Sequence, residues 1–400
     1  MPLLEPFAGL RYARDRVALD DVVAPPYDVI SEEDQAALEA RSPYNSVRVE
    51  LPRDDPPRDR YQAARARLDE WRATRILVRD SQPVFYAYRM RFEDGAGRAR
   101  ETLGVIGALG LEPPGEGDLL PHERTTPKPK GDRLYLLRAA QTNLSPIWGL
   151  SLATGLSTTI PQHGPDVMRC TDEDGVVHES WALAEPEAIE AIKASIASAP
   201  IVIADGHHRF ETAVAYQEER RAANGGQQGE FDLVMALIVE ATDDHLSVGA
   251  IHRLLRGLPD GFDLVTALSP WLELIPTTPP DATVGDRMIA AGALALVTAD
   301  GTWLARPWPE LERAAPQPLD SSRLDIALAT LPDHEVVYQH GWDRATAAVA
   351  KGDAQAAVLL RPASVAQIAA TGRGGERMPP KTTFFWPKPR TGIVFREVMG

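Results

Sequence analysis

Cysteine is almost absent from this sequence of 400 residues, which contains only Cys170. A single cysteine excludes a disulfide within the chain and a metal site built from several thiolates. The first residues also lack the basic and then apolar pattern of a secretory signal. These absences predict a cytoplasmic protein.

Long apolar runs and an excess of positive charge are missing as well. No stretch reaches the roughly 18–20 consecutive apolar residues of a membrane span, so the sequence predicts no membrane partner. The formal net charge is −15 at pH 7. Nucleic-acid binding needs a basic surface that displaces counterions, so this charge argues against nucleic acid as a partner. A small-molecule substrate is the expected partner, and the oligomeric state stays open.

Three widespread motifs are also absent. The sequence has no GxxxxGK[ST] phosphate loop, no GxGxxG dinucleotide fingerprint and no GxSxG nucleophile elbow. The common nucleotide-binding folds and the α/β-hydrolases therefore lose support. The apolar content of 44% is that of a packed globular protein, and the length suggests two or three domains.

Helical periodicity and strand-like alternation both occur along the chain, which predicts a mixed α+β, or α/β, fold. Alternating apolar residues predict a strand at 45–51, and a short apolar run predicts a buried strand at 201–204. Hairpins are predicted where two such runs flank a turn, as in DGAGR and DEDG. The predicted helices include residues 58–73, 131–141 and 210–223.

The most unusual stretch joins the predicted strand 201–204 to the helix after it. Its sequence is DGHHR, from Asp205 to Arg209. The first amides of a helix have no partner within the helix, and the helix dipole adds a partial positive charge, so this joint can bind an anion. Gly206 lets a ligand approach the backbone, and Arg209 can offer a two-pronged donor to a phosphate.

The remaining side chains of the joint have roles that depend on the ligand. His207 or His208 could move a proton or steady a phosphoryl oxygen, and Asp205 could orient an imidazole, bind a metal or cap the helix. The structural alternative is a capped helix start with one buried histidine. Adjacent histidines point apart, and the HExxH spacing that places two metal ligands on one helix face is absent.

A second charged stretch, LLPHERTTPKPKGDR at 119–133, predicts either a solvated loop or a lid over a phosphorylated ligand. As a lid it supplies Glu123 as a general base and Lys128 or Arg133 as a cation that holds negative charge. Further pocket candidates in this stretch are His122 and Thr125.

Three other stretches carry polar side chains, and each has a structural alternative as a rigid turn or a strand end. A polar loop before an apolar strand could also add hydroxyls and a cation to a pocket. The candidates are Tyr27 and Asp28 after a diproline, His252 and Arg253 in an apolar strand, and Lys381 and Thr382 in the loop PPKTT. The last region continues with Thr383, Lys388 and Arg390.

These stretches, taken in order, resemble the family catalogued as domain of unknown function 1015. The resemblance extends from residue 6 to about residue 396, which is nearly the whole chain. One departure is GAIHR, where the family pattern has proline and threonine before the HR pair. The matching pieces are PFAGLRY, VVAPPYDVIS, SPYNSVRVEL, HERTTPKPKGDR, SPIW, ADGHHRFETA, HR at 252–253 and MPPKTTFFWPKPRTGIVF.

A second, looser resemblance covers about a third of the chain. A helix, a short strand, DGHHR and a further helix are similar to the ParB/sulfiredoxin superfamily, which includes ParB, sulfiredoxin and a free serine kinase. This resemblance implies that the turn at 206–209 holds nucleotide phosphates. It also implies an α/β core over residues 1–258 with β-rich insertions at 80–180. A C-terminal α+β region over 259–400 would follow, with a tail, 377–396, that returns to the site.

The sequence therefore predicts a nucleotide-dependent phosphotransferase that acts on a small metabolite, such as the free amino acid serine, or a nucleotide hydrolase. ATP or ADP is the expected cofactor, with Mg²⁺ to spread the phosphoryl charge. The predicted phosphate-binding residues are Gly206, His208, Arg209, Lys128, Arg133 and Lys381. The predicted catalytic residues are Asp205, His207, His208 and Glu123, with Asp28 as a second candidate base.

Two other functions remain open at this point. One is a ParB-like regulatory protein that uses a nucleotide as a switch, although the acidic charge and the lack of a basic recognition helix disfavour it. The other is a metal-dependent hydrolase that uses His207 and His208, for which the spacing gives no positive support.

Overall fold

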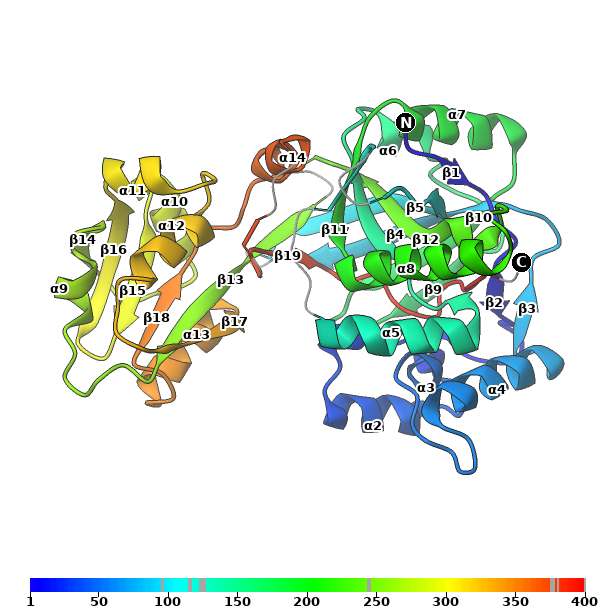
Figure 1. The fold of residues 1–400 in the computed structure, drawn as a ribbon, viewed down its shortest axis with the longest axis horizontal. Helices are drawn as coiled ribbons and strands as arrows, with labels where there is room; N and C mark the ends of the chain where they lie inside the picture. Colours follow the sequence, from blue (N-terminus) through cyan, green and yellow to red (C-terminus); the bar gives the residue numbers. More distant parts are fainter. Residues whose placement is uncertain are drawn as a thin grey trace. The chain divides into compact units, whose positions relative to one another are not determined.

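The computed structural model consists of two compact units, both drawn in Figure 1. The first unit comprises residues 1–246 and 387–400, and the second comprises residues 247–386. The structure describes residues 1–94, 97–113, 117–121, 127–242, 246–374, 378–379 and 381–398, with the backbone alone for 127–130. No helix in these ranges has both the length and the apolarity that crossing a membrane requires.

A large sheet forms the centre of the first unit (Figure 1). Most neighbouring strands in it are antiparallel, and two pairs, 119–121 with 201–203 and 147–151 with 236–240, are parallel. In spatial order, its strands are β6 (Leu119–Pro121), β11 (Ile201–Asp205), β8 (Ile147–Ser151), β12 (Leu233–Glu240), β5 (Ala99–Gly110), β4 (Phe85–Glu93), β10 (Val177–Leu183) and β9 (Met168–Thr171), while β1 (Leu4–Glu5) pairs with β5.

Helices and two small sheets complete the first unit. The helices are α1 (Leu19–Val22), α2 (Glu32–Arg41), α3 (Val47–Glu50), α4 (Arg60–Ala73), α5 (Pro127–Ala140), α6 (Leu156–Thr159), α7 (Pro186–Ala197) and α8 (His207–Ala223), with 3-10 turns η1 (Tyr27–Val29) and η2 (Glu230–Asp232). The small sheets pair β2 (Leu10–Tyr12) with β3 (Leu77–Arg79), and β7 (Thr142–Asn143) with β20 (Arg396–Glu397).

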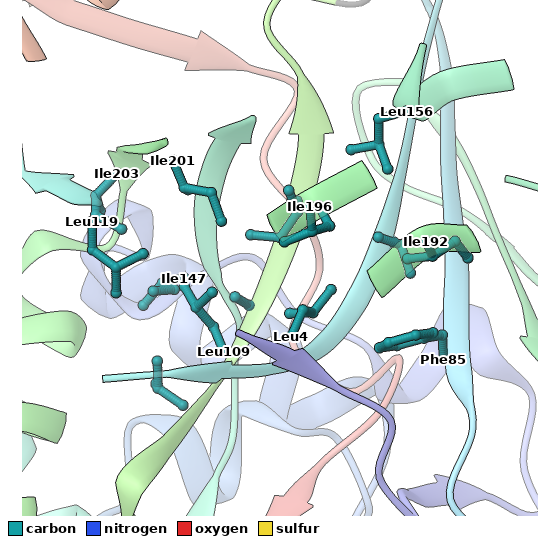
Figure 2. Packing of buried hydrophobic residues seen from close by; sticks show 14 of the residues in the cluster. Leu4, Phe85, Leu109, Leu119, Ile147, Leu156, Ile192, Ile196, Ile201 and Ile203 are labelled. Carbon is teal, nitrogen blue, oxygen red and sulfur yellow. The ribbon is translucent and has the colours of Figure 1, made fainter. Parts of the chain in front are cut away.

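The main apolar core of this unit joins the sheet to α6, α7 and α8. Figure 2 labels its residues from the strands, α6 and α7. Strand β11 contributes Ile201 and Ile203, and its β-branched side chains suit a strand that is buried on both faces. Helix α8 contributes Phe210, Ala213 and Val214, which recur at the helical spacing of three and four residues. Because each large side chain buried in this way stabilises the fold by about 1.5–3 kcal/mol, the joint between β11 and α8 is firmly held.

The second unit is an antiparallel sheet with helices on both faces. Strand alternation divides its core, because even and odd positions of one strand point to opposite faces. Thus Leu294 and Leu296 pack with α9, α11 and α12, whereas Ala295 and Val297 pack with α10 and α13. The strands are β14 (Leu272–Thr277), β16 (Gly301–Pro307), β15 (Leu294–Thr298), β18 (Ala356–Leu359), β13 (Ser247–Arg256), β17 (Glu335–His340) and β19 (Thr383–Trp386). The helices are α9 (Leu264–Leu268), α10 (Val284–Ala291), α11 (Pro309–Ala314), α12 (Asp320–Leu328), α13 (Trp342–Ala350) and α14 (Val365–Arg373).

The prediction of a mixed α/β fold is confirmed, and so are the hairpins β4–β5 and β9–β10. The strand predicted at 45–51 is wrong, because residues 47–50 form the helix α3. The side chain of Asn45 explains the difference. Its amide nitrogen donates to two carbonyls, those of Asp21 and Val23, and its oxygen accepts from the amide of Val47, which ties this segment to the preceding chain.

The division of the chain differs from the predicted boundary after residue 258. The second unit begins at residue 247, because β13 pairs with β17, β18 and β19 and so belongs to the second sheet. Of the predicted returning tail, residues 387–396 belong to the first unit. Helix α8 begins at His207, three residues before the predicted start, so the histidines and Arg209 lie in its first turn.

Candidate functional site

The joint between β11 and α8 is a tight turn centred on Gly206. Gly206 is the N-cap residue of α8 and has a φ of +85°, a conformation that costs other residues about 1–2 kcal/mol. Strand β11 also changes register against β8 between Ile203 and Asp205, and such a bulge redirects the side chain that follows it. The carboxylate of Asp205 is thereby held at the start of α8.

Asp205 lies between two cations. Its Oδ2 accepts from Nη2 of Arg209 at 2.9 Å, and its Oδ1 accepts from the ammonium of Lys388. All three side chains are between 11% and 13% exposed. Burial alone would raise the pKa of Asp205, but Lys388 and Arg209 outweigh it and lower the pKa to about 2. The carboxylate is therefore ionised at neutral pH, and the group of three side chains carries one net positive charge.

The position of Lys388 is set by hydrogen bonds of the C-terminal tail around it. Two residues further on, the amide of Arg390 donates to the hydroxyl of Tyr88 at 3.0 Å, and its guanidinium donates to Glu173 at 2.6 Å. Thr391 then forms a two-bond bridge with Ala24. These anchors fix the backbone beside Lys388, so its ammonium reaches Asp205 from a part of the chain 183 residues away.

The guanidinium of Arg209 is folded over Gly206. Its Nη1 donates to the hydroxyl of Ser145 at 3.1 Å and to the carbonyl of Pro146, while its Nη2 donates to Asp205. The predicted two-pronged contact with a phosphate would use these same nitrogens. In this arrangement Arg209 supplies positive charge to the turn and fixes its shape. The hydrogen-bond donors for an anion are then the first amides of α8, which have no partner within the helix.

We expect Gly206→Ala to lower the free energy of unfolding by about 2 kcal/mol. The positive φ accounts for about 1–2 kcal/mol of this, and the new Cβ would lie only 3.0 Å from Nη2 and 3.1 Å from Cζ of Arg209. Gly225→Ala is the matched control, because Gly225 has a φ of +72° and no atom within 4 Å of a Cβ. Chemical denaturation of both variants tests this, and an equal loss would show that Arg209 does not press on the turn.

Behind the turn lies a buried polar group that includes Glu50 and Arg133. Oε1 of Glu50 accepts from the hydroxyl of Ser145 at 3.1 Å, and Nη1 of Arg133 donates to the backbone carbonyl of Glu50 at 2.7 Å. Burial raises the pKa of Glu50, with Arg133 and Arg209 acting in the opposite direction. A cavity of about 50 Å³ adjoins this group, too small for a nucleotide and large enough for water.

Arg133, Tyr27 and Asp28 are the predicted residues that lie near Glu50. Besides Glu50, Arg133 bonds Asp132, and its guanidinium stacks on the ring of Tyr27 at 4.3 Å. Burial raises the pKa of the Tyr27 hydroxyl to about 12, with Arg209 opposing. Tyr27 is therefore a neutral hydrogen-bonding group rather than a base at neutral pH. Asp28 is exposed on the 3-10 turn η1.

The two histidines begin helix α8. His207 is buried, and its charge is one of the influences that lower the pKa of Asp205. His208 is half-buried on the next position of the same turn. Among the residues that the structure describes, no three His, Cys, Asp or Glu side chains come together as a metal site.

Of the predicted loop or lid at 119–133, residues 119–121 form β6 and 127–133 begin α5, while residues 122–126 lie outside the described residues. His122, Glu123 and Thr125 lie there, and for Lys128 only the backbone, in the first turn of α5, is described. Their roles remain predictions. Arg133, from the same stretch, is the member that the structure places beside Glu50.

Four other predicted residues belong to the second unit. The hydrogen bonds of three of them join backbone groups and a serine of that unit. Burial lowers the pKa of His252 to about 4, and its Nδ1 accepts from the amide of Leu360. The hydroxyl of Thr382 bonds to Ser321 and to the carbonyl of Pro379. Arg253 donates to the carbonyl of Ile251, and Lys381 has a φ of +58°. A part for these residues in the site remains a prediction.

Three residues of the site were not selected from the sequence: Glu50, Ser145 and Lys388. Glu50 lies within the stretch 45–51, whose alternation predicts a strand, and Ser145 is a lone serine before a proline. Lys388 lies in a candidate stretch, but the predicted cation of that stretch is Lys381, which stands beside two threonines. A Lys flanked by Pro387 and Pro389 is the sequence signal that could have identified it, since the rigid backbone limits where its ammonium can reach.

Comparison with known proteins gives one family match and several solved structures with a distant likeness. The model of the family described as protein of unknown function (DUF1015) matches residues 4–327. No curated protein matches the sequence significantly.

Among solved structures, a free serine kinase in complex with AMP has 15% identity and a TM-score of 0.39. The match covers 70% of this chain and 88% of the kinase chain. A mutant free serine kinase in complex with ADP has the same identity and TM-score, with 70% and 89% covered. A conserved hypothetical protein from Pyrococcus furiosus has 16% identity and a TM-score of 0.36, with 69% and 90% covered.

Proposed function

The chain belongs to the DUF1015 family of proteins of unknown function, and we propose that its 205–209 turn binds the phosphate groups of a nucleotide. The observation that carries the proposal is the ionised carboxylate of Asp205 between Lys388 and Arg209 at the start of α8. Two cations and one anion leave a net positive charge beside the first amides of a 17-residue helix. Such a site favours an anion of high charge density, and phosphate is that anion in a nucleotide.

Within this proposal the ligand is ATP or ADP, and the reaction is transfer of a phosphoryl group to a small metabolite, such as free serine, or to water. His207 and His208 stand at the end of the helix that faces the phosphate and are the candidates for assisting transfer. Glu123 or Asp28 is the candidate base, and Lys128, Arg133 and Lys381 are candidate cations around the ligand.

Mg²⁺ is expected to arrive with the nucleotide, since it is commonly held by phosphates with few protein ligands. Asp205 does not fit as its ligand, because both carboxylate oxygens already accept from cations. The positive charge of Mg²⁺ would help to neutralise that of the phosphates during transfer.

We expect Lys388→Met to weaken ADP binding about tenfold or more, because a charge-assisted contact beside the phosphate contributes about 1.5–3 kcal/mol. Isothermal titration calorimetry with ADP and ATP, each with and without Mg²⁺, measures this. Lys193→Met is the matched control, since Lys193 also pairs with a carboxylate, that of Glu5, at 2.8 Å on the same unit. Equal affinities for the two variants would remove Lys388 from the site, and no binding by the wild type would refute the proposal.

Phosphoryl transfer is tested separately by ³¹P NMR of the protein with ATP or ADP, Mg²⁺ and free serine. A new phosphomonoester signal identifies serine as acceptor, and growth of inorganic phosphate alone identifies hydrolysis. If the protein binds nucleotide but leaves it unchanged under every condition, the proposed binding site stands and the proposed enzymatic activity is refuted.

A further inference from the structure

A fully buried carboxyl group stands behind the turn and is only partly bonded. Glu50 is 2% exposed, and Oε1 accepts from Ser145, but Oε2 has no hydrogen-bond partner within the described part of the chain. Nη1 of Arg133 is 3.8 Å from Oε1, which is an ion pair without a hydrogen bond. Buried carboxyl groups with a purely structural role are normally fully bonded, since an unsatisfied one costs stability.

The hydroxyl of Ser145 links Glu50 to Arg209. It donates its single proton to Oε1 of Glu50 and accepts from Nη1 of Arg209, both at 3.1 Å. A hydroxyl can rotate, so the direction of its proton is set by the stronger acceptor, which here is the carboxyl group. Glu50 therefore orients the lone pair of Ser145 toward Arg209.

The cavity beside Glu50 provides a second connection. Nε of Arg209 also lacks a hydrogen-bond partner among the described residues, and Glu50 and Arg209 both line this cavity of about 50 Å³. The space accommodates water, which can accept from an Nε–H group and donate to a carboxylate oxygen. Its other polar lining residues are Arg133, Thr142, Asn143, Ser145 and Thr212.

We propose that Glu50 is a positioning residue of the phosphate site, which holds Arg209 folded over Gly206 through Ser145 and cavity water. This inference rests on the proposed function for its consequence, because the orientation of Arg209 matters to a ligand only if the turn binds one. The positioning itself is a property of the protein without ligand and can be tested independently.

The test follows the Nε–H resonance of Arg209 in the full-length protein by ¹H–¹⁵N NMR, assigned by its loss in Arg209→Ala. We expect Glu50→Ala and Ser145→Ala to shift and broaden this resonance. Glu50→Gln should retain it, since the amide oxygen still accepts from Ser145. Glu240→Gln is the control, because Glu240 is a buried carboxylate of the same unit that bonds Gly155 and Ser157 instead.

Binding of ADP by the same variants gives the functional readout. Glu50→Ala and Ser145→Ala should each weaken it about tenfold, which is typical when a supporting hydrogen-bond partner is removed, and Glu50→Gln should restore most of the affinity. If the wild type binds no ADP, the proposed function fails while the resonance still tests Glu50. An unchanged Arg209 resonance in both Glu50→Ala and Ser145→Ala would overturn the positioning role, and Ser145→Ala keeps this test open should Glu50→Ala not fold.

Discussion

Asp205→Asn is expected to lower the free energy of unfolding of the first unit by about 3–5 kcal/mol. The substitution keeps the shape of the side chain and removes the negative charge between Lys388 and Arg209, so two buried cations face each other without a counter-ion. Removing one partner from a buried ion pair has this cost because the remaining charge stays desolvated. Urea denaturation followed by the indole N–H NMR resonance of Trp148, which is buried in β8, reports on this unit.

The pH dependence of stability provides a second view of the same carboxylate. The pKa of Asp205 is lowered from 3.8 to about 2, so its stabilisation is present above pH 4 and is lost as the pH falls from about 4 to about 2. This difference corresponds to about 2 kcal/mol, which the wild type should lose and Asp205→Asn should not. Asp69→Asn is the control, since Asp69 also bonds two arginines but is 48% exposed and contributes less than about 1 kcal/mol. This variant keeps Asp205, so between about pH 4 and about pH 2 it should lose about as much stability as the wild type. Equal losses for the two variants would contradict the buried arrangement.

Arg209→Ala is expected to reduce nucleotide affinity about 100-fold and to lower the free energy of unfolding by about 3 kcal/mol. The variant loses the charge at the turn and leaves three acceptors, on Asp205, Ser145 and Pro146, without their donor. Charged hydrogen bonds contribute about 1.5–3 kcal/mol each, and truncation of a buried arginine also leaves a cavity. Calorimetric titration with ADP and denaturation in urea measure the two effects.

A control on the same helix separates charge from position. Arg221, in the last turn of α8, bonds Asp232 at 2.7 Å and is 45% exposed. Arg221→Ala removes an equal charge from α8 and should change the free energy of unfolding by less than about 1 kcal/mol and leave ADP affinity within twofold. If Arg221→Ala weakened ADP binding as much as Arg209→Ala, the effect would be one of net charge and the turn would lose its role.

Much of the fold is readable from local patterns. The buried strand β11, the glycine turn and the helix α8 follow from a run of β-branched residues, one glycine and a helical spacing of apolar residues, because each of these is a short-range preference of the backbone. The alternation at residues 45–51 predicts a strand, but so short an apolar run fits a strand and a helical turn equally well. Hydrogen bonds from Asn45 to distant carbonyls decided between them.

The sequence by itself determined that Asp205, Gly206 and Arg209 share one turn at the start of a helix, since spacing along the chain dictates that. Only the tertiary structure decided which partners meet there. Lys388 comes from a tail that leaves the second unit and returns to the first, and Glu50 reaches Arg209 through Ser145. Contacts between residues 64 to 183 positions apart depend on how whole elements pack, and no local preference of the chain encodes them.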